Sequence, residues 1–329
     1  MITTLAPAKD TTFHAVRRRL SALLPDPTPL ASAVPLELLS RGVQDAPTLR
    51  SAEVLEAGGM RAHAVSPPYI PRFAAFLDGA QRSLVVSWTG GVPIVHGTVA
   101  AVVRERRDRR MTTWSSPILR RALYAPLALL SPAAAEALRL QDLEIVDTLE
   151  KRKPESAHPF ALQEIAYQSV LGAREQAEQE LAKQWCATNA DDLCIDGGIS
   201  GSEPVARSTI VVGVIKSHQT LYAAAEDLPM IMALRVAERS SVVHVDVSSR
   251  VPVASWYLRL RDHDGRDPFW GLVRIEVALS GGAAALPERA ETVSRWVLAE
   301  ALPLSVPDAR WDKMVYGIRD CEEYLRAIQ

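Results

Sequence analysis

The sequence predicts an α/β protein in which a mixed central sheet is flanked by helices. Thr209–Ile215 is a β-branched, wholly apolar run, which is typical of a strand buried on both faces. Phe73–Arg106 predicts a long hairpin that turns at Gly90-Gly91. Pro159–Trp185 has the length and composition of a long helix. Together these patterns indicate a sheet with at least one long helix packed on it.

The rest of the chain predicts shorter elements around that framework. Residues 1–65 are expected to form a partly helical N-terminal extension, and residues 66–329 one elaborated domain with a helical insertion at about 116–190. The insertion is predicted to be helical from Pro117, with breaks near Pro132 and at Lys151–Pro154. The other predicted helices are Phe13–Leu24, Val34–Leu39, Ala52–Glu56, Leu228–Arg239, Glu291–Leu302 and Asp312–Gln329, and the other predicted strands are Ser241–Val247, Ser255–Leu260 and Gly271–Leu279.

Composition excludes several classes of protein. The chain has 329 residues, 48% of them hydrophobic, and a net charge of −2, so it is not coated in basic charge, although one basic groove fits such a total. Its three cysteines form no CxxC pair, which argues against a disulfide framework or a zinc site. No secretory leader and no apolar run of about 18 residues is present. We therefore expect a soluble protein of the reducing cytoplasm.

Charged residues stand where strands should be apolar. Asp196 directly follows the apolar run Leu193–Ile195 and precedes two glycines, and Lys216 ends the buried strand after Ile215. At the ends of neighbouring strands these two side chains would lie at the rim of a sheet, where α/β folds place their sites. A plain turn and a solvated strand end would give the same pattern. Asp78 lies inside the first hairpin strand, where an edge position reaching water is the alternative to a functional role.

Further charged residues group along the chain. Arg104–Arg110 is a basic cluster that is either solvated surface or a phosphate-contacting patch. Arg174 and Glu178, four residues apart on the predicted helix, share a face. Arg274 and Glu276 alternate on one face of their predicted strand.

In this order the motifs resemble those of the NurA family of DNA-repair nucleases. The matching pieces are FLDG at the hairpin, RxxxE in the helix, CIDGGIS, VVGVIKSH, WYLRL and VRIEV, and they span Phe73 to the C-terminus. Each piece is weakly specific, whereas their order, and GVIKS in particular, is more so. The resemblance implies a PIWI-like, RNase H-like core and a metal-dependent nuclease of DNA end resection and double-strand break repair.

Residue by residue, the resemblance implies a carboxylate site. Asp78 and Asp196 would hold metal from adjacent strands, and Glu178 from the helix, with Glu175 and Glu180 as its rivals. Clustered carboxylates repel one another without a cation, and two Mg²⁺ or Mn²⁺ ions on hard oxygen ligands suit phosphodiester hydrolysis. The predicted supporting residues are Lys216 and Arg274 to neutralise phosphate, Glu276 to orient either of them, and Arg104, Arg106, Arg107, Lys216, His218 and Arg259 to bind nucleic acid.

One position departs from the family. A Tyr followed about two helical turns later by a His closes the family's site, and Tyr316 resembles that Tyr, but no His follows it. Asp320 is taken as the closing metal ligand, with Glu322 and Glu323 as candidates; His218 could substitute if the fold brings it near.

The resemblance also implies a homodimer that works with a HerA-type hexameric ATPase. The chain has no GxxxxGK[ST] motif, so any ATP-driven step must come from such a partner. A catalytically weak or inactive PIWI-like module, which binds nucleic acid or the ATPase, is the alternative, and a phosphotransferase on a related core ranks last.

Overall fold

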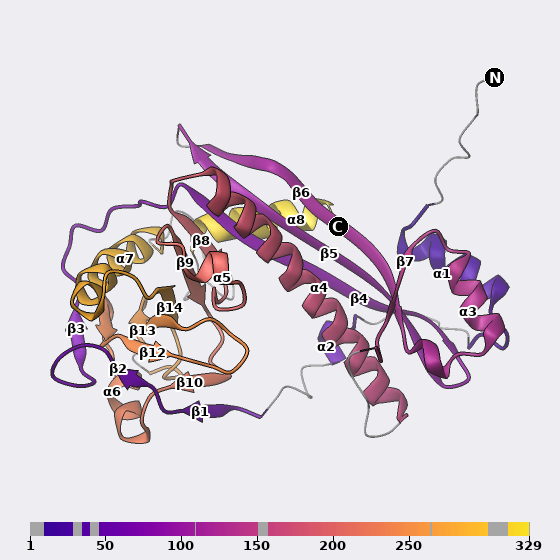
Figure 1. The fold of residues 1–329 in the computed structure, drawn as a ribbon, viewed down its shortest axis with the longest axis horizontal. Helices are drawn as coiled ribbons and strands as arrows, with labels where there is room; N and C mark the ends of the chain where they lie inside the picture. The colour runs from indigo at the N-terminus through magenta and orange to yellow at the C-terminus, as the bar shows by residue number, and fades with distance from the viewer. Residues whose placement is uncertain are drawn as a thin grey trace.

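A computed structural model describes residues 10–28, 35–39, 46–108, 110–150, 157–263, 265–301 and 315–328. Within these residues twelve strands form one mixed sheet, which confirms the predicted α/β architecture (Figure 1). The strands of the sheet are β2 (Glu53–Val54), β3 (Ala62–Ala64), β4 (Ala75–Thr89), β5 (Val92–Arg107), β6 (Arg110–Ala125), β7 (Glu144–Asp147), β8 (Leu193–Asp196), β9 (Val211–Ile215), β11 (Glu238–Ser240), β12 (Val243–Val245), β13 (Val253–Arg259) and β14 (Leu272–Ala278).

The centre of the sheet runs β6-β5-β4-β8-β9-β14. β4, β5 and β6 are consecutive antiparallel strands, whereas β8 pairs parallel with β4 and β9 parallel with β8. β14 and β13 then continue the sheet antiparallel. A second, two-stranded sheet pairs β1 (Thr48–Arg50) with β10 (Thr220–Tyr222). The parallel pairing of β4 with β8 brings the first residues of two strands from distant parts of the chain side by side.

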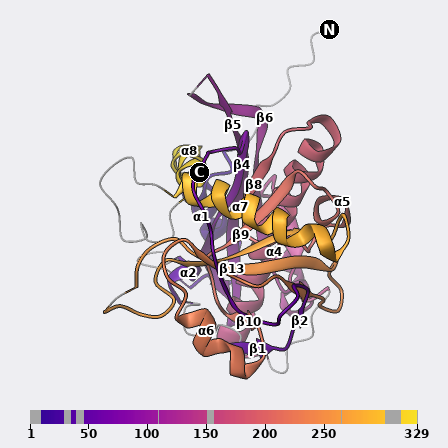
Figure 2. The same ribbon diagram turned by 90° about the vertical axis from the view of Figure 1, so that its left-hand side faces the viewer.

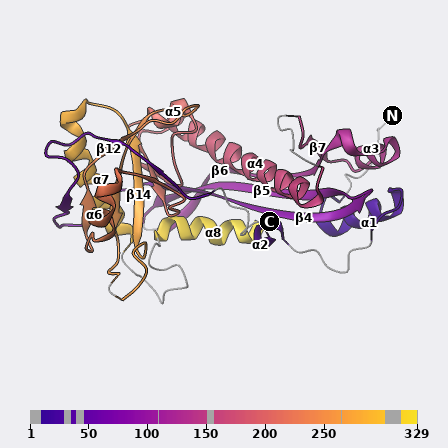
Figure 3. The same ribbon diagram turned by 90° about the horizontal axis from the view of Figure 1, so that it is seen from below.

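Helices cover both faces of this sheet. Figure 3 shows α4 and α8 running along opposite faces of the long strands, and Figure 2 looks onto α7. Ala177, Leu181 and Trp185 of α4 pack on one face, and Ile318, Cys321 and Leu325 of α8 on the other. The described helices are α1 (Phe13–Leu23), α2 (Leu36–Leu39), α3 (Pro132–Arg139), α4 (Pro159–Thr188), α5 (Glu203–Ala206), α6 (Leu228–Met232), α7 (Leu286–Glu300) and α8 (Tyr316–Ile328).

Several predicted elements differ from those observed. The segment predicted to be helical from Pro117 begins as strand β6, which pairs with β5 along most of its length. Ala52–Glu56 contains strand β2 rather than a helix, and the helix predicted over Leu228–Arg239 ends at Met232. Pairing with β5 keeps β6 extended, and pairing with β12 does the same for β2, so both override local helix propensity. After Met232 the chain turns and enters β11. The predicted break at Lys151–Pro154 lies outside the described residues.

The described residues before the long hairpin pack against the rest of the fold. β2 and β3 add to the edge of the large sheet, through β12 and β11. α1 packs with α3 against the distal end of the long strands, where Val16 and Leu20 are fully buried. No helix among the described residues is long and apolar enough to cross a membrane.

Candidate metal centre

Asp78 and Asp196 lie side by side because of the register between β4 and β8. Leu77 is paired with Ile195, so the two aspartates occupy the next position on the neighbouring strands. Leu77 and Ile195 pack against α4, and side chains alternate along a strand, so both aspartates turn toward the face that α8 covers. Asp78 is only 6% exposed. The sequence expectation that these two carboxylates come from adjacent strands therefore agrees with the register.

The two strands part directly after this point. β8 ends at Asp196, and Gly197 follows with φ +131°, a conformation that favours glycine. β4 continues past Asp78, whose Oδ1 accepts a hydrogen bond of 2.8 Å from the Gly79 amide. Where β4 and β8 diverge, after Asp78 and Asp196, the sheet has an open rim at which side chains from both faces can meet.

Glu322 on α8 completes the group. Oxygen atoms of Asp78, Asp196 and Glu322 all lie within 4.8 Å of one another. The neighbouring Cys321 is buried and donates to the Phe76 carbonyl oxygen at 3.3 Å, which fixes the helix against β4 at this level. Three carboxylates from two strands and a helix thus face one another at the rim.

Asp320, predicted to be the closing ligand, is not part of this group. Its carboxylate forms an ion pair with Arg104, whereas Glu322 reaches the two aspartates. Residues two apart on a helix point about 200° apart, so both cannot face the same site. Tyr316 opens α8 and is half-buried, outside the group of three carboxylates. The carboxylate that α8 brings to the two aspartates is that of Glu322, one of the alternatives to Asp320.

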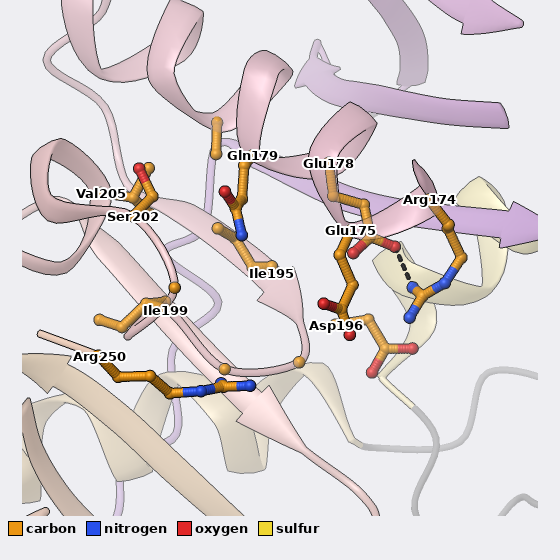
Figure 4. Close-up of a pocket in the computed structure, with 14 residues that line it drawn as sticks. Arg174, Glu175, Glu178, Gln179, Ile195, Asp196, Ile199, Ser202, Val205 and Arg250 are labelled. Atoms are coloured by element: carbon orange, nitrogen blue, oxygen red, sulfur yellow. Dashed lines mark hydrogen bonds and ion pairs between the residues drawn. The ribbon is translucent and has the colours of Figure 1, made fainter. Parts of the chain in front are cut away.

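Glu178 approaches from the opposite face, on α4. A Cβ at position 79 would overlap its Oε1, so the helix carboxylate lies against the glycine that follows Asp78. Glu178 forms an ion pair with Arg174, as their spacing predicted (Figure 4). Burial raises the pKa of Glu178 to about 7; Asp196 and Glu175 add to this effect and Arg174 opposes it. Glu178 is therefore a fourth carboxyl group beside the three, held by an arginine.

The electrostatics of the rim indicate excess negative charge. Burial raises the pKa of Asp78 well above its usual range, and Asp196 and Glu178 raise it further. Lys216 donates to Oδ2 of Asp196 at 3.0 Å. Burial would lower the pKa of the Lys216 ammonium, but Asp196, Asp78 and Glu322 outweigh burial and raise it. Two cationic side chains are set against these three acids, Lys216 and Arg326, which pairs with Glu322 at 3.7 Å. Three carboxylates within 4.8 Å of one another still exceed them, so a divalent cation fits the oxygen-rich rim.

Arg274 and Glu276 lie farther along the sheet, on β14. They are paired with each other, Nη1 to Oε1, at 2.6 Å. The second oxygen of Glu276 accepts from the Ile199 amide at 2.9 Å, in the loop after β8. Glu276 thus orients Arg274, one of its two predicted targets, and its own described contacts do not include Lys216.

Most of the residues predicted to bind nucleic acid form hydrogen bonds or ion pairs within the protein. Arg106 forms a two-pronged ion pair with Glu300, at 2.7 Å for each nitrogen, and His218 bonds the Leu272 carbonyl oxygen and stacks on Phe269. Arg259 is buried and donates to the backbone carbonyl oxygens of Leu234, Pro268, Trp270 and Met232.

The remaining two arginines of that prediction lie in the last four residues of β5. Arg104 bonds Asp320 and Thr113, and its guanidinium group lies 5.0 Å from the ring centroid of Tyr324. Arg107 is exposed and pairs with Glu105 at 2.8 Å. Of the predicted basic residues, Lys216 is the one at the carboxylate rim, whereas His218 packs against Leu272 and Phe269.

A cavity of about 140 Å³ borders the rim on the α4 side (Figure 4). Its wall includes Glu178, Asp196 and the loop after β8, together with Arg250, which sequence reasoning did not single out. Arg250 follows a turn and belongs to no recognisable sequence motif, so only the folded chain reveals its position.

No protein-family model matches the chain, and no curated protein sequence matches it significantly.

Proposed function

We propose that this chain is a metal-dependent nuclease of the NurA type, with an RNase H-like core, that hydrolyses phosphodiester bonds of DNA. The single observation that carries the proposal is the convergence of Asp78, Asp196 and Glu322 within 4.8 Å at one rim of the sheet. The order β6-β5-β4-β8-β9 supports it, because three antiparallel strands followed by two parallel ones place both aspartates on neighbouring strands.

The residues of the rim fit a divalent cation. Asp78, Asp196 and Glu322 would hold Mn²⁺ or Mg²⁺ through carboxylate oxygens, which are hard ligands, and Glu178 is placed to assist a second ion once Arg174 releases it. Such ions supply positive charge against phosphate and lower the pKa of bound water. The raised pKa of Asp78 supports this assignment, since burial and, after it, the neighbouring acids destabilise its ionised form, which a bound cation would favour.

The chain's own side chains have distinct roles. Lys216 fixes the Asp196 carboxylate through Oδ2 and leaves an ammonium group at the rim, where it can attract a phosphodiester. Arg174 holds Glu178 in place before substrate arrives. Burial of Asp78 to 6% exposure removes water from that side chain, which strengthens every charge interaction around it.

The test is degradation of labelled single- and double-stranded DNA with Mn²⁺, with Mg²⁺ and with EDTA. We expect cutting that requires the metal and is lost, by at least about a hundredfold, in Asp196→Asn. Asp191→Asn is the matched control, because Asp191 is an exposed acid just before the other end of the same strand. Equal cutting by wild type and Asp196→Asn would contradict the proposal.

A binding module without catalysis is the second candidate. It is favoured by the ion pair of Arg174 with Glu178, which already neutralises one acid without metal. Calorimetric titration with Mn²⁺ separates the two readings. A wild-type protein that binds DNA, takes up no Mn²⁺ and cuts nothing supports the module. A homodimer and a HerA-type hexameric ATPase partner remain part of the nuclease proposal, carried by the sequence resemblance.

A further inference from the structure

A second cavity, of about 360 Å³, lies next to the carboxylate rim. The two cavities share Gly198, in the loop after β8, and Arg250. Figure 4 shows Arg250 with its guanidinium group turned toward the side on which Asp196 lies. The second cavity is thus adjacent to the proposed metal centre and is joined to it through one arginine.

The walls of this cavity are positively charged. Arg50 from β1, Arg250 from the turn before β13, and Arg274 from β14 contribute three guanidinium groups. The one carboxylate among the lining residues is that of Glu276, which is already engaged by Arg274 and by a backbone amide. Because Arg274 neutralises that acid, Arg50 and Arg250 leave a net charge of about +2 on the lining, which favours an anion in this space.

Arg274 also has an unused donor. Its side chain is 10% exposed, and its Nε is buried without a hydrogen-bond partner among the described residues. Its guanidinium group lies 4.9 Å from the ring centroid of Tyr222, and Nη1 donates to Ser255 and Glu276. A buried guanidinium group that is not fully hydrogen-bonded is costly, so an anion in the adjoining cavity would stabilise its charge.

The geometry points to a phosphate subsite: the Arg50/Arg250/Arg274 cavity holds a phosphate of the same nucleic-acid strand whose scissile phosphodiester lies at Asp78, Asp196 and Glu322. This inference rests on the proposed nuclease function and adds to it a second phosphate position. A strand suits the site better than a free nucleotide, because Arg250 borders both cavities and successive phosphates of one strand can occupy them together.

Binding without cleavage isolates the subsite. Fluorescence anisotropy of a labelled single-stranded oligonucleotide in EDTA, over a series of salt concentrations, would be measured for wild type, Arg250→Ala, Arg50→Ala and the double variant. Both arginines are exposed, so neither change disturbs the core. Arg18→Ala is the matched control, an exposed arginine on α1 at the distal end of the long strands.

We expect the double variant to lose at least about tenfold in affinity, and its log K against log salt slope to become shallower by about 0.7 for each lost phosphate contact. Arg18→Ala should match wild type. Identical affinities and slopes for wild type and both single and double variants would overturn the inference. So would full displacement of the oligonucleotide by an equal concentration of inorganic phosphate or a nucleoside monophosphate, because the site would then take free anions.

A parallel assay of DNA cutting with Mn²⁺ separates the two claims. Wild type that cuts DNA, with variants that bind and cut equally well, refutes the subsite and leaves the nuclease function standing. Arginine-dependent strand binding by a protein that cuts nothing in Mn²⁺ or Mg²⁺ supports the subsite and refutes the nuclease.

Discussion

Replacing Glu178 by Gln should change how the stability of the metal-free protein depends on pH. The pKa of Glu178 is about 7 in the folded protein, against 4.5 for an ordinary glutamate. The folded state therefore holds the proton more tightly than the unfolded state. The resulting stabilisation is complete below about pH 4.5 and is lost as the pH rises through about 7.

The size of the effect follows from that difference. Each pKa unit corresponds to about 1.4 kcal/mol, so ionising Glu178 costs the folded protein about 3 kcal/mol, most of it between about pH 5 and about pH 8. The side chain is 12% exposed, so solvent screening reduces this figure little. Glutamine resembles the protonated acid, so the variant should escape this loss and should overtake wild type at the higher pH.

Urea unfolding in EDTA at the two pH values measures the free energy of unfolding of both proteins. Glu180→Gln is the matched control, since Glu180 lies on the same helix, is 45% exposed and pairs with Arg120. If Glu178→Gln and wild type lose the same stability between about pH 5 and about pH 8, the buried acid is not the titrating group. The electrostatic argument for the metal centre would then lose one of its supports.

Three further outcomes are expected. Glu322→Gln should weaken Mn²⁺ binding, measured by calorimetry, by at least about tenfold, whereas Asp320→Asn should leave it within about twofold, because only Glu322 reaches the aspartates; the reverse ranking would contradict the site. Arg259→Met should lower the free energy of unfolding, measured in urea, by about 3 to 5 kcal/mol, because the buried guanidinium group donates to four backbone carbonyl oxygens that would lose their donor; a loss below about 1 kcal/mol would contradict it. Gly79→Ala should cost about 1 to 3 kcal/mol in the same assay, since the new methyl group overlaps Glu178; an unchanged midpoint would show that the helix yields freely.

The two aspartates could be identified from the sequence. An acid inside an otherwise apolar strand and an acid directly after one are rare enough to stand out, and Asp78 and Asp196 do lie on paired strands. Their closeness depends on a register that skips more than a hundred residues of chain, so their distance apart could not come from the sequence. A contact between residues four apart on one helix is easier to predict from the sequence, as the ion pair of Arg174 with Glu178 illustrates.

Other features could not be read from the sequence, for physical reasons. Asp320 and Glu322 carry the same kind of group, and choosing between them requires the rotation of α8 about its axis, which packing on β4 sets. Arg259 looks like a phosphate ligand in sequence because arginine serves both purposes, yet its burial among backbone carbonyl oxygens makes it structural. β6 was mistaken for helix because the long strand beside it, rather than its own residues, stabilises its extended form.

The origin of the three clustered carboxylates also has a bearing on biosynthesis. They come from the hairpin, from the strand after the long helix, and from α8, so they enter the growing chain far apart in time. A nascent chain that has emerged only as far as β14 carries both aspartates but lacks Glu322. If the proposed nuclease function is correct, a ribosome-bound or prematurely terminated chain holds an incomplete set of metal ligands, and cutting begins only after α8 has docked on β4.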